Sequence, residues 1–361
     1  MKQALAPTLY EMPAPDKIIL QWLRCCVALV FLMVLIGGLT RLSESGLSIV
    51  EWKLFSGTFP PLTTAAWQEA FTHYQATPEF IIENAHMNLE EFKGIFWLEY
   101  IHRLLGRVIG LAYLLPLLWF SARRMLSTRL KWQMWGVFAM VCAQGVVGWY
   151  MVKSGLVNDP RVSPYRLAFH LCLATIIAMR TYWLLKLYSS HLQQGGLSRN
   201  RAEDFSVPFQ NNRRFAWVLL ALMMVQMFFG AMVAGLHAGL IYNSFPLMGG
   251  QFFPPESWTL EPVIRNVFEH TATVQFIHRW LAFIVLGAVL WQWFRARDKA
   301  TRRVVYVVML QVVLGISTLL SVVAIALASA HQLTAILLVL AQIAVISSLP
   351  ASNKRLSAQL Q

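Results

Sequence analysis

The chain has 361 residues, of which 57% are hydrophobic and only 13% are charged, and its formal net charge is +13. A soluble protein of this length needs a far more charged surface, so this composition excludes a soluble globular fold. Apolar runs of about 20 residues, the length at which a helix crosses a hydrocarbon core, recur along the chain. The sequence therefore predicts an all-α integral membrane protein.

Eight membrane-spanning helices are expected. The segment before the first, "MKQALAPTLYEMPAPDK", is too polar and too rich in proline for a cleaved signal, so the first span is expected to remain as an anchor. The expected spans are 18–40, 96–120, 131–152, 166–188, 214–236, 273–294, 303–325 and 327–349.

The positive charge is concentrated in alternate loops. Arginine and lysine gather between spans two and three, four and five, and six and seven, whereas the loop between spans one and two is rich in glutamate. By the positive-inside rule, the basic loops and both termini of this multi-pass protein are expected to be cytoplasmic. The positive net charge is thus explained by the orientation of the helices in the membrane and does not indicate a nucleic-acid partner. All four cysteines fall within spans, which excludes a disulfide framework.

The two halves of the chain resemble each other. "EYIHRLLGRVIGLAYLL" in span two matches "QFIHRWLAFIVLGAVL" in span six, and "AQGVVGWYM" in span three matches "LQVVLGIST" in span seven, which aligns Gln144 with Gln311 and Gly148 with Gly315. Each unit holds four helices, so both units cross the membrane in the same sense. The repeat predicts two tandem, pseudo-symmetric four-helix bundles, with an N-terminal bundle at 1–190, a cytoplasmic linker at 191–213 and a C-terminal bundle at 214–361.

Four histidines recur in the repeat, each near the start of an even-numbered span: His102, His170, His278 and His331. Even-numbered spans run from outside to inside, so all four rings should lie at a similar depth towards the outer face. Two imidazoles that face each other inside a four-helix bundle can ligate a heme iron from both sides. Alternatively, an intramembrane histidine bonds to a neighbouring helix. Zinc is disfavoured, because no carboxylate or thiolate recurs with the histidines.

Arg103 and Arg279 follow two of these histidines in a repeated "IHR". A guanidinium group is well shaped to bind the carboxylates of heme propionates, and this contact is expected for both residues. Helix pairing, or an interfacial arginine that reaches the lipid headgroups, is the alternative.

The repeat breaks at Glu99, whose counterpart in the second half is Gln275. Glu99 precedes His102 by three residues and so shares its helix face. A carboxylate can move protons or stabilise positive charge, whereas an amide does neither well. The difference predicts that the first half performs chemistry, with Glu99 as the candidate catalytic residue, and that the second half holds an electron-transfer heme. Alternatively, Glu99 pairs with Arg103 or Arg107 on its own helix.

Three segments, "EFKGIFWLEYIHRLLGRVIG", "GGLTRLSESGLSIVEWKLFSGTFPPL" and "AGLHAGLIYNSFPLMGGQFFP", resemble the heme A synthase family, and the likeness extends from about residue 20 to residue 350. The resemblance implies oxidation of the C8 methyl group of heme O to a formyl group, by successive hydroxylations, to give heme A for a terminal oxidase. It implies heme O as the substrate between His102 and His170, and heme b as the cofactor between His278 and His331. The chain lacks outer-loop cysteines and so resembles the cysteine-lacking class of proteobacteria and mitochondria.

The resemblance also implies partners within the membrane: lipid, an electron donor, the heme O synthase and further copies of the chain in a homo-oligomer. Two rival functions are a di-heme b electron-transfer protein without substrate chemistry and a proton-coupled transporter that uses the histidines as a relay. The difference between Glu99 and Gln275 argues against the first, and the pairing of the histidines at one depth argues against the second.

Overall fold

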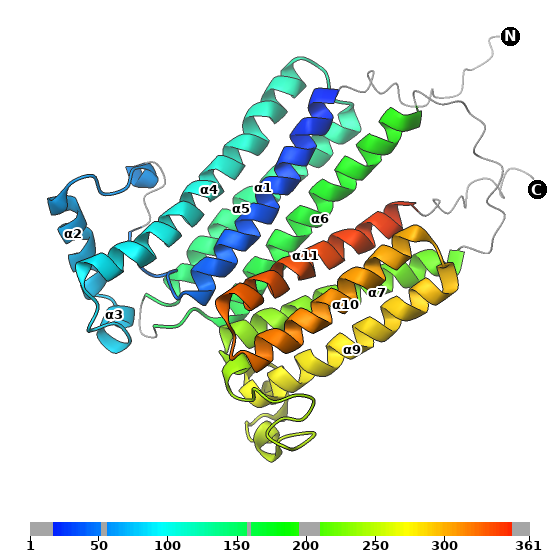
Figure 1. Cartoon of the computed structure of the whole chain (residues 1–361). Coiled ribbons are helices and arrows are strands. Elements are labelled where there is room, and N and C mark those ends of the chain that lie inside the picture. Colours follow the sequence, from blue (N-terminus) through cyan, green and yellow to red (C-terminus); the bar gives the residue numbers. More distant parts are fainter. Residues whose placement is uncertain (1–16, 52–55, 157–159, 195–209, 349–361) are drawn as a thin grey trace, which may run out of the picture.

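The computed structural model of the chain describes residues 17–51, 56–156, 160–194 and 210–348 (Figure 1). Among these residues, eight helices are long and apolar enough to cross a membrane, which confirms the predicted all-α, eight-span fold. They are α1 (Lys17–Leu42), α4 (Leu89–Ala122), α5 (Thr128–Lys153), α6 (Pro164–Gln194), α7 (Gln210–Gly235), α9 (Thr271–Ala296), α10 (Lys299–Leu320) and α11 (Ile325–Ser348). The segment before the first helix, and residues 195–209 of the expected linker, lie outside the described residues.

Helix α4 begins two turns earlier than expected, at Leu89 instead of residue 96. Its start is a capping box: the Asn88 side chain accepts hydrogen bonds from the backbone N–H groups of Glu90 and Glu91, and the Glu91 carboxylate accepts from the Asn88 N–H. These bonds satisfy donors that a helix start otherwise leaves unpaired. The helix therefore extends beyond its apolar segment into the outer loop.

The seventh span ends earlier than expected, at Leu320 instead of residue 325. Val322 and Val323 adopt left-handed conformations, with φ of 56° and 62°, and α11 begins at Ile325. A β-branched residue rarely takes positive φ, and the segment contains neither glycine nor proline, so the sequence shows no sign of this break.

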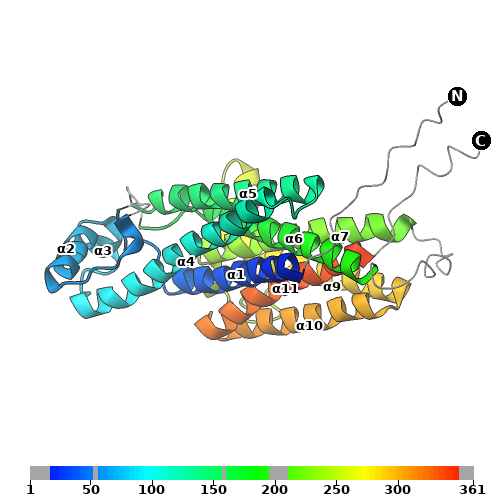
Figure 2. The same cartoon turned by 90° about the horizontal axis from the view of Figure 1, so that it is seen from above.

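The spanning helices form two rings of four. In the first half, α1 packs on α4, α4 on α5, α5 on α6, and α6 on α1; in the second, α7, α9, α10 and α11 pack in the same order. Between the halves, α1 packs on α11, α6 on α7, and α6 on α11 (Figures 1 and 2). In the repeat, α1, α4, α5 and α6 correspond in order to α7, α9, α10 and α11. The α1–α11 and α6–α7 contacts are therefore counterparts of each other, and the α6–α11 contact joins two corresponding helices. This pattern supports the proposed pseudo-two-fold relation between two bundles.

The two halves share one apolar core, which contains buried side chains from all eight spanning helices, among them Leu23, Met134, Leu219 and Ile343. Within the second half, the buried Gln342 of α11 also donates to a backbone carbonyl of α7. Within a membrane, such close packing and interhelical hydrogen bonding hold helices together.

The loop after α1 and the loop after α7, called the outer loops for the side on which the sequence predicts them, lie at the same end of the helices (Figure 1). In the first half, α2 (Thr64–Gln75) packs on the start of α4 through an aromatic cluster of Phe71, Tyr74, Phe92, Phe96 and Tyr100. The short α3 (Pro78–Ile82) packs on α2 through Phe80. In the second half, the loop holds three short 3-10 helices and α8 (Asn266–Glu269). This end of the molecule carries the predicted site residues.

Candidate functional site

Each of the four predicted histidines lies against a glycine on a neighbouring helix. A Cβ added at Gly37, Gly148, Gly230 and Gly315 would lie 3.2, 3.1, 2.9 and 2.8 Å from the rings of His102, His170, His278 and His331, respectively. Only glycine allows the imidazole to approach the backbone so closely. Each glycine lies in the last two turns of its helix, so the four rings gather at one end of the bundles. The repeat aligns Gly148 with Gly315, whereas Gly37 and Gly230 lie in a weaker match between "LIGGLTRL" in the first span and "FFGAMVAGL" in the fifth.

Three of the histidines also contact a glutamine that stands one helical turn before the glycine, in "QGVVG", "QMFFG" and "QVVLG". The amide nitrogens of Gln144 and Gln226 lie 3.2 and 3.1 Å from the Nδ1 atoms of His170 and His278, and that of Gln311 lies 3.3 Å from Nε2 of His331. The Nδ1 atom of His331 is 3.1 Å from the Gln311 backbone oxygen. A metal-ligating imidazole donates the N–H of its other ring nitrogen to an acceptor, and for His331 the Gln311 backbone oxygen is such an acceptor. Sequence analysis aligned Gln144 with Gln311 but missed Gln226.

The second pair has the spacing of two axial ligands. The ring centroids of His278 and His331 are 6.4 Å apart, and the ring planes are nearly perpendicular, at 86°. Two imidazoles that each bind one metal ion through a nitrogen at about 2 Å have ring centres roughly 6 Å apart. The carbonyl oxygens of the Gln226 and Gln311 side chains are buried without a hydrogen-bond partner, so these amides are available to an added group. The pair therefore fits a heme iron.

Next to this pair, Arg279 and Gln275 tie α9 to the outer loop. Arg279 donates to the carbonyl oxygens of Ser244 and Tyr242 at 2.8 and 2.5 Å, and Gln275 donates to the same Tyr242 oxygen at 3.1 Å. The Nε atom of Arg279 and the Oε1 atom of Gln275 are buried and have no hydrogen-bond partner among the residues that the structure describes. A propionate placed beside Arg279 would accept a hydrogen bond from this Nε atom.

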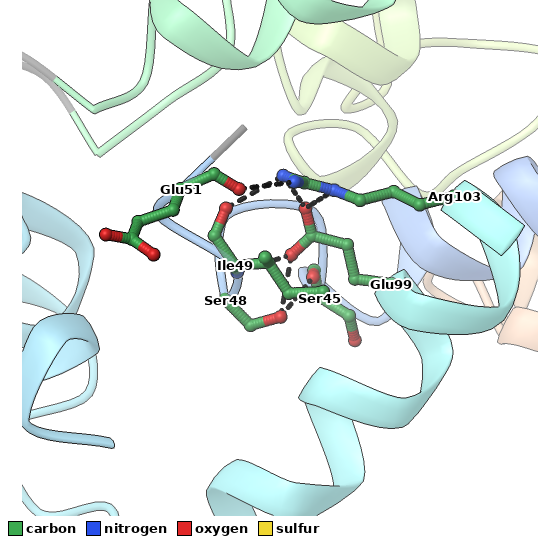
Figure 3. Close-up of polar contacts among 6 residues, drawn as sticks. All are labelled: Ser45, Ser48, Ile49, Glu51, Glu99 and Arg103. Carbon is green, nitrogen blue, oxygen red and sulfur yellow. Dashed lines mark hydrogen bonds and ion pairs between the residues drawn. The ribbon is translucent and has the colours of Figure 1, made fainter. Parts of the chain in front are cut away.

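In the first half, Glu99 is buried at 2% exposure and accepts four hydrogen bonds (Figure 3). Its Oε2 atom accepts from the Ser48 hydroxyl at 2.7 Å and the Ile49 N–H at 2.8 Å, and its Oε1 atom accepts from the Arg103 Nε and Nη2 atoms at 2.9 and 2.6 Å. Arg103 also donates to the carbonyl oxygens of Ile49 and Glu51. The carboxylate and the guanidinium together fasten the segment after α1 to α4.

Both arginines therefore do the same structural work, since each joins the second span of its half to the loop after the first span. The pairing of Glu99 with Arg103, which the sequence left as an alternative, is present at 2.6 Å. The contact of Arg103 and Arg279 with propionates stays a prediction. The difference between the halves is also clear: Glu99 and Arg103 hold the first loop as a charged pair, whereas Arg279 and the neutral amide of Gln275 hold the second.

One hydrogen bond joins α11, which carries His331, to α1, which packs against His102. Gln332, the residue after His331, donates to the Val34 carbonyl oxygen on α1 at 3.0 Å. A Cβ at Gly38, the residue after Gly37, would lie 2.7 Å from the Gln332 side chain. The segments that carry the two sites are thus in direct contact across the interface between the halves, which sequence analysis did not foresee.

These features define a class: a polytopic helical membrane protein with four histidines set against glycines, one pair of which has the spacing of two ligands to a heme iron. Residues 20–343 match the COX15-CtaA family model, described as cytochrome oxidase assembly protein, and the chain belongs to this family.

Several relatives bear one name, "Heme A synthase". The protein from Nitrosospira multiformis is 46% identical over 335 residues, which cover 90% of this chain and 91% of the relative. The protein from Nitrosomonas eutropha is 42% identical over 88% of this chain and 89% of its own length. One from Bradyrhizobium sp. is 44% identical over 93% of this chain and 92% of its own length.

Proposed function

We propose that this chain is a heme A synthase that oxidises the C8 methyl group of heme O to a formyl group. The observation that carries the proposal is the full-length similarity, at 42–46% identity, to relatives of that name, joined to the four histidine–glycine contacts. Two successive hydroxylations, followed by loss of water from the resulting diol, account for the change from methyl to formyl. The formyl-bearing product would serve a heme-containing terminal oxidase.

The two halves have different roles in this proposal. His102 and His170 hold the heme O substrate in the first half, where Glu99 and Arg103 place a buried charged pair on the same helix as His102. His278 and His331 hold heme b, which supplies electron-transfer chemistry when bound. The neutral Gln275 in place of a carboxylate is consistent with a site that binds and orients without moving a proton.

The proposal places the protein in the bacterial inner membrane, with both termini in the cytoplasm and both sites towards the outer face. The basic loops support this orientation by the positive-inside rule. Lipid, a membrane electron donor, the heme O synthase and further copies of the chain are the partners that we infer. Direct transfer from the heme O synthase would spare so apolar an intermediate from water.

The test is to express the chain in a bacterium that makes heme O but no heme A, and to separate the extracted hemes by chromatography. Heme A in cells with the chain, and none in cells with an empty vector, is the expected result. Heme b alone, in the presence of abundant heme O, would contradict the proposal and favour the di-heme electron-transfer protein. A purified protein without any heme would instead favour the transporter.

A further inference from the structure

The outer loop of the second half is tied to the helix that carries His278. Arg279, the next residue on α9, donates to the carbonyl oxygens of Tyr242 and Ser244 at 2.5 and 2.8 Å. These hydrogen bonds hold the backbone of the loop against α9 on either side of a single residue, Asn243. Any group that Asn243 binds is therefore positioned relative to His278.

The side chain of Asn243 binds the end of α10. Its Nδ2 atom donates to the Leu319 carbonyl oxygen at 2.9 Å and to the Gly239 carbonyl oxygen at 2.8 Å. Both partners are acceptors, so they identify the NH2 end of the amide, and both of its hydrogens are used. The Leu319 carbonyl is one of the last four of its helix, which have no partner within the helix. Asn243 thus caps α10 from a distant part of the chain.

The turn that follows α10 is strained. Residues 321–324 connect α10 to α11, and Val322 and Val323 both take left-handed conformations there. Such a conformation is sterically unfavourable for a β-branched residue and persists only where the surrounding contacts impose it. The outer loop supplies two of these contacts. Asn243 binds the helix end before the turn, and a Cβ added at Gly239 would lie 3.0 Å from the Val323 side chain.

The turn determines how α11 lies against α10, and therefore where His331 lies. The ring of His331, in the second turn of α11, contacts the Gln311 backbone oxygen and would lie 2.8 Å from a Cβ added at Gly315, both on α10. A slip of α11 along α10 would break both contacts. In the first half, the corresponding connection runs from Ser154 to Ser163 and is longer, so this short turn is a feature of the second half.

We infer that Asn243 is the positioning residue that sets His331 opposite His278. The loop segment around it joins α9, through Arg279, to the strained turn before α11, so the helices that carry the two histidines are held to one piece of backbone. The near-perpendicular ring planes, at 86°, are the arrangement that this connection maintains. The inference rests on the proposed function for the presence of heme between these two histidines.

The test compares full-length variants of both residues. Asn243→Ala removes both side-chain hydrogen bonds. Val322→Gly allows the left-handed conformation without a steric penalty and loses little packing, because the Val322 side chain is 57% exposed. The two substitutions are also combined. Asn88→Ala is the matched control, since it too removes two hydrogen bonds from a helix end, but in the first half.

Two measurements separate a positioning role from general destabilisation. Hydrogen exchange at the Val323 amide, which donates to the Thr318 carbonyl oxygen at 2.9 Å, reports opening of the turn whether or not heme is bound. The electron paramagnetic resonance spectrum of a ferric heme with two imidazole ligands responds to the angle between the ring planes. The signal that disappears in His331→Ala identifies the heme of the second pair.

Asn243→Ala should raise the exchange rate at Val323 roughly tenfold, which is the combined effect of two lost neutral hydrogen bonds on an equilibrium constant. It should also change the shape of the second-pair signal. Addition of Val322→Gly should return the exchange rate and the signal towards those of the wild type, because the turn then forms without the cap. Asn88→Ala should leave both measurements unchanged.

A second-pair signal of unchanged shape in Asn243→Ala would overturn the inference even if exchange at Val323 rises, because Asn243 would then hold the turn without orienting His331. Unchanged exchange would also overturn it. If Asn243→Ala does not accumulate, the double variant decides the question: recovery of the protein with the wild-type signal supports the inference, and no recovery overturns it. Hemes extracted from the same cultures separate the two proposals. Absence of heme A alongside the expected spectra would contradict the synthase function and leave the role of Asn243 intact.

Discussion

Replacement of Glu99 separates its chemical role from its structural one. In Glu99→Ala, the Arg103 guanidinium, itself only 12% exposed, loses its counter-charge, and the Ser48 hydroxyl and the Ile49 N–H lose their acceptor. Removal of one partner from a buried ion pair costs about 3–5 kcal/mol. Glu99→Gln keeps one acceptor oxygen and the side-chain shape but removes the charge. We therefore expect a smaller loss of local stability, of about 1.5–3 kcal/mol.

The local cost can be measured by hydrogen exchange at the Ile49 amide, which donates directly to Glu99. A loss of about 3 kcal/mol corresponds to an increase in exchange rate of roughly a hundredfold, if opening of this segment limits exchange. Glu99→Ala should show at least this increase, and Glu99→Gln a smaller one. Glu90→Ala is the control, because Glu90 lies on the same helix with its side chain 78% exposed.

Conversion of heme O is the second readout. If the carboxylate acts in the reaction, Glu99→Gln should lower conversion by about a hundredfold or more, the usual contribution of an acid or base, while the heme content is retained. Conversion at the wild-type level in Glu99→Gln would refute the catalytic role and leave Glu99 as a residue that holds the loop. Unchanged exchange at Ile49 in Glu99→Ala would refute the structural reasoning.

Three further outcomes follow from the geometry. His331→Ala should abolish the heme b absorbance, which is checked in the spectrum of the purified protein, and its retention would contradict the ligand assignment. Gly148→Ala should displace the His170 ring, because the new Cβ would lie 3.1 Å from it, and should raise heme loss in detergent, whereas Gly145→Ala on the same helix meets nothing within 4 Å and should not. Burial raises the pKa of Glu79 in the outer loop from 4.5 to about 8, so its contribution to stability is complete below pH 4.5 and is lost as the pH rises towards about 8. Thermal unfolding against pH should show this decline, and Glu79→Gln should flatten it; a parallel decline in the variant would assign the effect to another group.

The sequence by itself determined the class, the number of spans and the repeated histidines. These features are local or depend on spacing: about 20 apolar residues predict a span wherever they occur, and the "IHR" repeat needs no knowledge of packing. The contrast between Glu99 and Gln275 was visible in the same way. The break after Leu320 was not, because two valines there take a conformation that their residue type disfavours.

Only the tertiary structure decided which side chains meet. Glu99 reaches Ser48 because the chain after α1 folds back over α4, a contact that joins residues 51 positions apart. Likewise, Gln226 and His278 meet only because α7 and α9 pack in one register. Helix periodicity states which residues share a face, but the facing residue of the next helix depends on how the two helices are packed together.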